Sequence, residues 1–244
     1  MSDAAGANSP GVFLPWDSEF FGFRIGRANG ARLGASARAR LLAWSAEERL
    51  RCLYFFADGN DGATLEQAHA GGFKFVDVRV DLAMPLRAGA PAELPERVRV
   101  ATTADLPALE AIARTAHTDT RFAKDAGFPA DRVAELYARW IQRDFREHQV
   151  LAWDAPAGGA AGYVTCQFNA ATRVGRIGLI AVAAGQQGRG AGRALVEGAL
   201  RRFAQAGCAE ARVVTQVSNL AAQRLYQAHG FRTAEAHATF HRWF

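Results

Sequence analysis

Residues 177–195 read Ile177-Gly-Leu-Ile-Ala-Val-Ala-Ala-Gly-Gln-Gln-Gly-Arg-Gly-Ala-Gly-Arg-Ala-Leu195. An apolar strand leads into a turn rich in glycine, and the pattern predicts a helix over 190–206. The first backbone N–H groups of a helix have no partner within it and carry partial positive charge. Glycines at 188, 190 and 192 remove the Cβ atoms that would keep an anion away from these groups. The segment therefore predicts an anion site, most often one for a pyrophosphate.

Two familiar pyrophosphate motifs do not fit this turn. A dinucleotide fingerprint needs a third glycine, but Gly190 and Gly192 are followed by Leu195. The sequence also has no Gly-Lys-Ser or Gly-Lys-Thr triplet of a P-loop. The spacing Gln187-x-x-Gly190-x-Gly192 remains, and on its own it also suits a tight turn with no ligand.

A second motif follows the first in the chain. It reads Asn219-x-x-Ala222-x-x-Leu225-Tyr226-x-x-x-Gly230-Phe231. With both motifs in this order, the chain resembles the GNAT acetyltransferases, whose two signatures these are. The resemblance implies an α/β fold with a mixed sheet, acetyl-CoA as co-substrate and no metal. The coenzyme A site that it implies consists of Ile180, Ala181, Val182, Gln187, Gly188, Arg189, Gly190, Ala191, Gly192, Arg193, Asn219 and Ala222.

The resemblance also implies how these residues act. The strand before the turn splays from its neighbour, so that the free backbone of Ile180–Val182 pairs with pantetheine. A backbone N–H near Val182 stabilises the oxyanion, and Asn219 contacts coenzyme A near the pantetheine. Tyr226 lies by the sulfur, where its hydroxyl gives a proton to the leaving thiolate. On helical spacing alone, Tyr226 would instead be a core residue.

Four further segments are similar to one subgroup, the sugar-nucleotide N-acetyltransferases. They are Leu14-Pro-Trp-Asp-Ser-Glu-Phe-Phe-Gly22, Thr120-Arg-Phe122, Tyr137-x-x-Trp140 and Phe168-Asn-Ala170. This similarity implies that the acceptor is a nucleotide-linked deoxyamino sugar such as dTDP-4-amino-4,6-dideoxy-D-galactose.

An acceptor of that kind needs phosphate, base and sugar contacts. Arg121 is the candidate for a phosphate, because a guanidinium matches phosphate geometry. Phe122 could stack on a base or sugar or simply pack, and Asn169 could bond sugar hydroxyls or make a turn. His117 and Asp119 are candidate relays for the ammonium proton, although a lone histidine is more often structural.

Two other classes of function stay open. The same fold could acetylate an aminoglycoside, a polyamine or a protein N-terminus, although the acidic run that a polyamine site would favour is missing. Alternatively, coenzyme A could be a structural ligand, or the basic surface could bind nucleic acid without any catalysis.

Composition narrows the choice of partners. The 244 residues are 50% hydrophobic, enough for one large core or two smaller ones. The net charge of +5 comes with interspersed acidic residues rather than basic clusters, so no nucleic-acid partner is expected.

The cysteines and histidines predict neither a disulfide nor a metal site. The three cysteines are far apart and form no CxxC pair, and His237 and His241 have no cysteine or carboxylate at ligand spacing. Without a membrane-length apolar run or a signal peptide, we expect a cytoplasmic protein, with a homodimer possible.

The chain divides at a segment rich in proline. We expect a small α/β domain over 1–85 with a frayed start, a linker over 86–96, and the GNAT domain over 97–244. Gln67-Ala-His-Ala-Gly-Gly-Phe73 resembles Leu225-Tyr-Gln-Ala-His-Gly-Phe231. This weak repeat, unless it arises by chance, makes the first domain a reduced copy of half the GNAT fold. A hairpin or strand pair is expected over 231–243.

Overall fold

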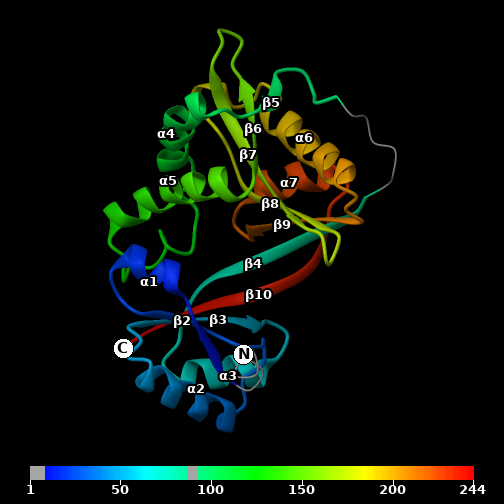
Figure 1. The fold of residues 1–244 in the computed structure, drawn as a ribbon. Coiled ribbons are helices and arrows are strands. Elements are labelled where there is room, and N and C mark those ends of the chain that lie inside the picture. Colours follow the sequence, from blue (N-terminus) through cyan, green and yellow to red (C-terminus); the bar gives the residue numbers. More distant parts are fainter. Residues whose placement is uncertain (1–8, 87–92) are drawn as a thin grey trace. The chain divides into compact units, whose positions relative to one another are not determined.

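The computed structural model describes residues 9–86 and 93–244 and shows two compact units (Figure 1). Unit 1 consists of Met1–Arg79, Arg121–Pro129 and Ala236–Phe244, and unit 2 consists of Val80–Thr120 and Ala130–Glu235. The sequence-based division assigned 121–129 and 236–244 to the second domain, whereas they cluster here with unit 1. The expected frayed start and residues 87–92 of the expected linker lie outside the described residues.

Over its described residues, unit 1 combines a small mixed sheet with three helices. Its own elements are β1 (Gly11–Phe13), α1 (Pro15–Phe21), β2 (Ile25–Ala28), α2 (Ala35–Glu47), β3 (Cys52–Asp58) and α3 (Gly62–Ala70). Strand β1 pairs with β2 antiparallel, and β2 pairs with β3 parallel. The other edge of β3 pairs antiparallel with the end of β10 (Arg232–Trp243), in a register that joins Cys52 to Trp243. Buried Leu53, Phe55 and Phe240 form part of its core.

Aromatic packing explains why 121–129 clusters with unit 1. The ring centroids of Phe122 and Phe128 lie 5.6 and 4.7 Å from that of Phe21. Both rings are buried, and burial of each such side chain is worth about 1.5–3 kcal/mol. Local sequence does not reveal these contacts, because their partners lie a hundred residues away.

Unit 2 is a larger mixed sheet with helices on both faces. Its own elements are β5 (Val98–Val100), α4 (Leu106–Ala116), α5 (Ala130–Glu147), β6 (Gln149–Asp154), β7 (Ala160–Asn169), β8 (Val174–Val182), α6 (Ala191–Gln205), β9 (Glu210–Gln216) and α7 (Leu220–Ala228). The strands lie in the order β4-β9-β8-β7-β6-β5, where β4 (Lys74–Pro85), like β10, has residues in both units. From β5 to β8 neighbours are antiparallel, while β8 and β9 are parallel.

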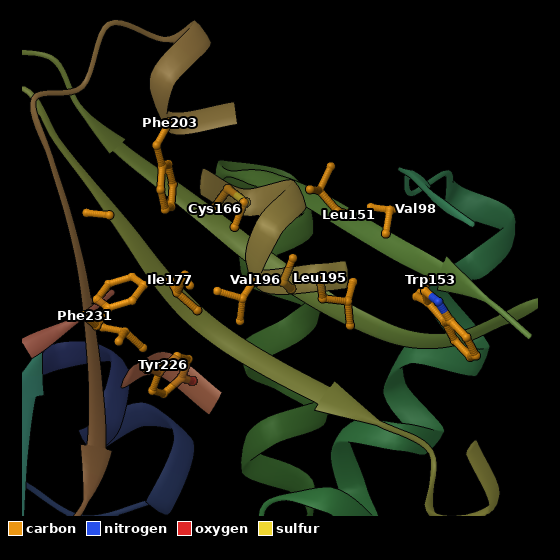
Figure 2. Close-up of a cluster of buried hydrophobic side chains, with 14 of the residues drawn as sticks. Val98, Leu151, Trp153, Cys166, Ile177, Leu195, Val196, Phe203, Tyr226 and Phe231 are labelled. Carbon is orange, nitrogen blue, oxygen red and sulfur yellow. The ribbon is translucent and has the colours of Figure 1, made fainter. Parts of the chain in front are cut away.

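Helix α6 is fixed on the sheet of unit 2 by its apolar face. Its Leu195, Val196 and Phe203 are buried in one cluster with Leu151 and Ile177 of the sheet (Figure 2). A close-packed interface of this kind resists displacement, because each lost methylene costs about 1 kcal/mol. The N-terminus of α6 is therefore held next to the end of β8.

The two units repeat one order of elements. In unit 1, parallel β2 and β3 enclose α2 and are followed by α3 and β4, as parallel β8 and β9 enclose α6 and are followed by α7 and β10. A reduced half-fold would have this order, and the copy relationship itself stays a prediction.

The expected hairpin over 231–243 is wrong, because residues 232–243 form one continuous strand. The segment has no Gly, Pro, Asn or Asp that would turn the chain.

Within the described ranges, no helix is both long and apolar enough to cross a membrane.

Candidate active site

The turn before α6 has the backbone that its glycines allow. Gly188 and Gly190 have φ of +76° and +82°, a left-handed conformation that other residues adopt at a cost. Gly190 is the N-cap of α6, and no side chain caps the helix. The N–H groups of Ala191, Gly192 and Arg193 thus stay available at the positive end of the helix dipole. Arg189 and Arg193 are exposed beside them, so the turn suits a diphosphate.

The strand that enters the turn separates from its parallel neighbour. Pairing between β8 and β9 begins at Val174 and Glu210 and ends at Ile177 and Val213. From there to Val182, β8 pairs only with β7, on its other edge. The edge of Ile180–Val182 that faced β9 is therefore open to an extended ligand, and Gln187 Nε2 lies 3.3 Å from the Val182 carbonyl oxygen on this strand.

Helix α7 begins at the second motif. Asn219 is its N-cap, and its Oδ1 accepts a hydrogen bond from the Ala222 amide at 3.1 Å. The Asn219 side-chain amide keeps its two donors for another partner. A Cβ on Gly192 would lie 3.4 Å from Leu225 Cδ2, so small residues on α6 let α7 pack against it. The two motifs are thus neighbours in space.

Tyr226 projects from α7 into the core cluster of unit 2 (Figure 2). Its side chain is 3% exposed and its ring lies 5.8 Å from that of Phe231. Burial raises the pKa of Tyr226 above its usual value, so the phenol keeps its proton at neutral pH. A protonated phenol has a proton to give, as a general acid must, although the raised pKa makes it a weak acid.

The structure gives His117 and Asp119 separate partners. His117 Nε2 lies 2.9 Å from the Tyr163 hydroxyl, and the His117 ring stacks on Tyr137 at 4.4 Å. Burial lowers the pKa of His117 to about 4, so its imidazole is neutral at pH 7 and binds a proton only weakly. Asp119 Oδ2 accepts a hydrogen bond from Ser218, the residue before Asn219. Tyr163 and Ser218 carried no motif, so sequence reasoning missed both partners.

Arg121 and Phe122 belong to unit 1. The Arg121 guanidinium lies 3.9 Å from the Tyr54 ring and 4.1 Å from the Phe122 ring, and Nη1 is 3.0 Å from His241 Nε2. Asp125 Oδ2 is 2.6 Å from His241 Nδ1, which orients this imidazole. Phe122 is buried, so the contacts observed for it are packing contacts.

Asn169 lies at the opposite end of β8 from the glycine turn. Its Oδ1 accepts the Thr172 amide at 3.0 Å, which makes the turn between β7 and β8. Asn169 pairs with Val174, eight residues before Val182, which is about 26 Å along a strand. The structure does not bring Asn169 together with the turn.

Among the described residues, no group of three or more His, Cys, Asp or Glu side chains could hold a metal ion.

The geometry is typical of one class of protein. A strand that leaves its parallel neighbour, followed by a turn with bare amides at a helix start, offers an open strand edge next to a turn that suits a diphosphate. Residues 109–231 match the Acetyltransferase (GNAT) family. The chain belongs to this family and is an acyl-CoA N-acetyltransferase.

A relative within the family extends over most of the chain. The dTDP-fucosamine acetyltransferase of Escherichia coli O6:H1 is 33% identical over 226 residues, which cover 89% of this chain and 91% of the relative. The chain is thus similar to a named enzyme along both units.

Solved structures agree on the fold. A GCN5-related N-acetyltransferase from Sphaerobacter thermophilus has a TM-score of 0.63 and 18% identity, over 90% of this chain and 72% of its own. A protein of unknown function from Staphylococcus epidermidis has a TM-score of 0.68 and 12% identity, over 99% of this chain and 94% of its own.

Proposed function

We propose that the enzyme acetylates the amino group of a nucleotide-linked deoxyamino sugar such as dTDP-4-amino-4,6-dideoxy-D-galactose. The observation that carries this choice is the 33% identity to the dTDP-fucosamine acetyltransferase, which covers nine tenths of both chains. The product of such a reaction would serve surface-polysaccharide synthesis in the cytoplasm.

The site residues support direct transfer from acetyl-CoA to the amine. The diphosphate suits the amides of Ala191–Arg193, and the pantetheine arm suits the open edge of β8. The open-edge amides of Ile180 and Val182 would stabilise the oxyanion that forms when the amine attacks the thioester carbon. This arrangement needs no covalent enzyme intermediate.

Three proton transfers accompany the reaction. The acceptor ammonium must lose a proton before it attacks, and His117 and Asp119 in unit 2 are the candidate relays for that proton. When the carbon–sulfur bond breaks, Tyr226 gives its proton to sulfur, so that coenzyme A leaves as a thiol. The amine nitrogen gives up its second proton as the amide forms, and this restores the phenol.

Arg121 is the candidate for the acceptor's phosphate groups. Its guanidinium lies against two aromatic rings and His241, so little side-chain entropy remains to be lost on binding. The further nitrogens of the guanidinium can form a bidentate bond to a phosphate.

A substrate panel tests the proposal. Release of free thiol from acetyl-CoA is followed with dTDP-4-amino-4,6-dideoxygalactose, an aminoglycoside, spermidine and a peptide with a free N-terminus, each against a blank without amine. The proposal expects turnover of the sugar nucleotide far above that of the other amines. Turnover of the peptide, aminoglycoside or polyamine without turnover of the sugar nucleotide would reverse the choice.

A further inference from the structure

Strands β7 and β8 change register where β8 has left β9. Val164 pairs with Ile180, yet Cys166 pairs with Ile177, so Thr165 faces both Gly178 and Leu179. This is a β-bulge, in which the extra residue loses its place in the ladder. The N–H group of that residue then needs another acceptor, since a buried unpaired amide is costly.

A side chain supplies the acceptor. Thr165 Oγ1 lies 2.9 Å from the Leu179 amide nitrogen and 2.7 Å from Asp144 Oδ2 on α5. The hydroxyl has one hydrogen, so it donates to the carboxylate and accepts from the amide. Thr165 and Asp144 are both 0% exposed. At Gly178 a Cβ would stand 2.6 Å from Thr165 Oγ1, so the bulge needs glycine there.

The bulge sets the direction of the next amides. Leu179 N–H points to β7, and so does Ala183 N–H, which donates to the Ala161 carbonyl at 2.9 Å. Because N–H groups alternate between the two edges of a strand, those of Ile180 and Val182 point to the edge that β9 has left. Ile180 is the first residue after the bulge.

We propose that Thr165 and Asp144 are positioning residues for acetyl transfer. Together they hold the Leu179 amide against β7, and this turns the Ile180 amide toward the carbonyl oxygen of the bound acetyl group. The inference rests on the transfer mechanism proposed above. Neither side chain touches the reacting atoms, so their effect passes through the backbone of β8.

The chain offers a matched control in unit 1. Thr64 Oγ1 accepts the Leu33 amide at 2.8 Å and donates to Asp61 Oδ2 at 2.7 Å, and Thr64 is 1% exposed. Thr64→Val and Thr165→Val therefore remove the same set of bonds from equally buried positions. Of the two, only Thr165 is bonded to β8, the strand with the open edge.

The kinetic test compares three variants with the sugar nucleotide as acceptor. Thr165→Val should lower kcat about 10- to 100-fold, because the Ile180 amide would still donate to the oxyanion but from a misaligned position. KM for acetyl-CoA should stay within about threefold of the wild-type value, since the hydrogen bond from this amide to the acetyl oxygen strengthens in the transition state. Thr165→Ser should recover most of kcat, and Thr64→Val should lower the melting temperature but keep kcat. A full kcat in Thr165→Val, no recovery in Thr165→Ser, or an equal loss of kcat in Thr64→Val would overturn the proposal.

A second test needs no acceptor, so it separates this inference from the proposed substrate. Calorimetry measures the affinity of acetyl-CoA and of CoA for the wild type and for Thr165→Val. The ratio of the two affinities should fall about two- to threefold in the variant through weaker acetyl-CoA binding, the lower end of the scale of one hydrogen bond. An unchanged ratio overturns the inference. Failure of the wild type to use the sugar nucleotide contradicts only the proposed substrate.

Asp144→Asn serves if Thr165→Val does not fold. It preserves the volume and an acceptor oxygen for the Thr165 hydroxyl but loses the charge that strengthens this bond. The expected change is a kcat about three- to tenfold lower with KM for acetyl-CoA unchanged. A wild-type kcat in a folded Asp144→Asn would contradict the proposal.

Discussion

Gly190→Ala is the sharpest perturbation of the diphosphate site. Gly190 has φ of +82°, and a Cβ there would meet nothing within 4 Å, so its cost to the unliganded protein lies in the backbone alone. The left-handed conformation costs alanine about 1–2 kcal/mol. Alanine also restricts the unfolded chain, and this raises the free energy of unfolding by about 0.4–1 kcal/mol and offsets part of that cost. The net loss of stability is about 1 kcal/mol, which lowers the melting temperature by about 2–4 °C.

Binding should suffer much more than stability. A turn that relaxes toward negative φ moves the amides of Ala191–Arg193 out of line, and each charge-assisted hydrogen bond is worth about 1.5–3 kcal/mol. Loss of one such bond raises the Kd for CoA about 10- to 100-fold. Gly207→Ala is the control, because Gly207 follows α6 at its other end with φ of +74° and equal open space.

Thermal unfolding and calorimetric titration of CoA measure the two effects. Both variants should lose similar stability, but only Gly190→Ala should lose affinity. If Gly190→Ala binds CoA within twofold of the wild type, or Gly207→Ala weakens binding as much, the assignment of the turn to the diphosphate is refuted.

Three further results are expected. Tyr226→Phe should lower kcat about 100-fold at constant KM, the scale of general acid catalysis, and steady-state rates that match the wild type would leave Tyr226 a packing residue. Burial lowers the pKa of His117 and His241 to about 4, below the unfolded value of about 6.5. Their stabilising contribution is therefore full above pH 6.5 and is lost as the pH falls toward 4; melting curves should show this decline, and His117→Gln should flatten it. Arg121→Lys should raise KM for the sugar nucleotide about tenfold, because lysine loses the stacking and the bidentate bond, while the Kd for CoA measured by calorimetry stays constant.

Local patterns predicted much of the fold and the elements that carry the candidate site. The strand, turn and helix around Gly190 were predictable because glycine spacing and apolar period act over a few residues. The N-cap Asn219 and the helix that carries Tyr226 follow from the same short-range chemistry.

Local patterns do not predict contacts between residues that lie far apart in the chain. Sequence gave no sign that Phe122 and Phe128 would pack on Phe21, because aromatic residues in loops are equally typical of ligand sites. Asp144 and Thr165 lie on different elements, and neither has a motif that would connect them to the Leu179 amide. Asn169 was a candidate to bind the sugar because a short side-chain amide can bond to a hydroxyl group. The same amide can bond to the backbone nearby and make a turn, and the pattern alone does not separate the two roles.

A crystal structure of the complex with CoA tests the central claim most directly. The account predicts the diphosphate on the amides of Ala191–Arg193, pantetheine along Ile180–Val182, and the sulfur within hydrogen-bond reach of the Tyr226 hydroxyl. A diphosphate bound away from the glycine turn, or a sulfur remote from Tyr226, would contradict it.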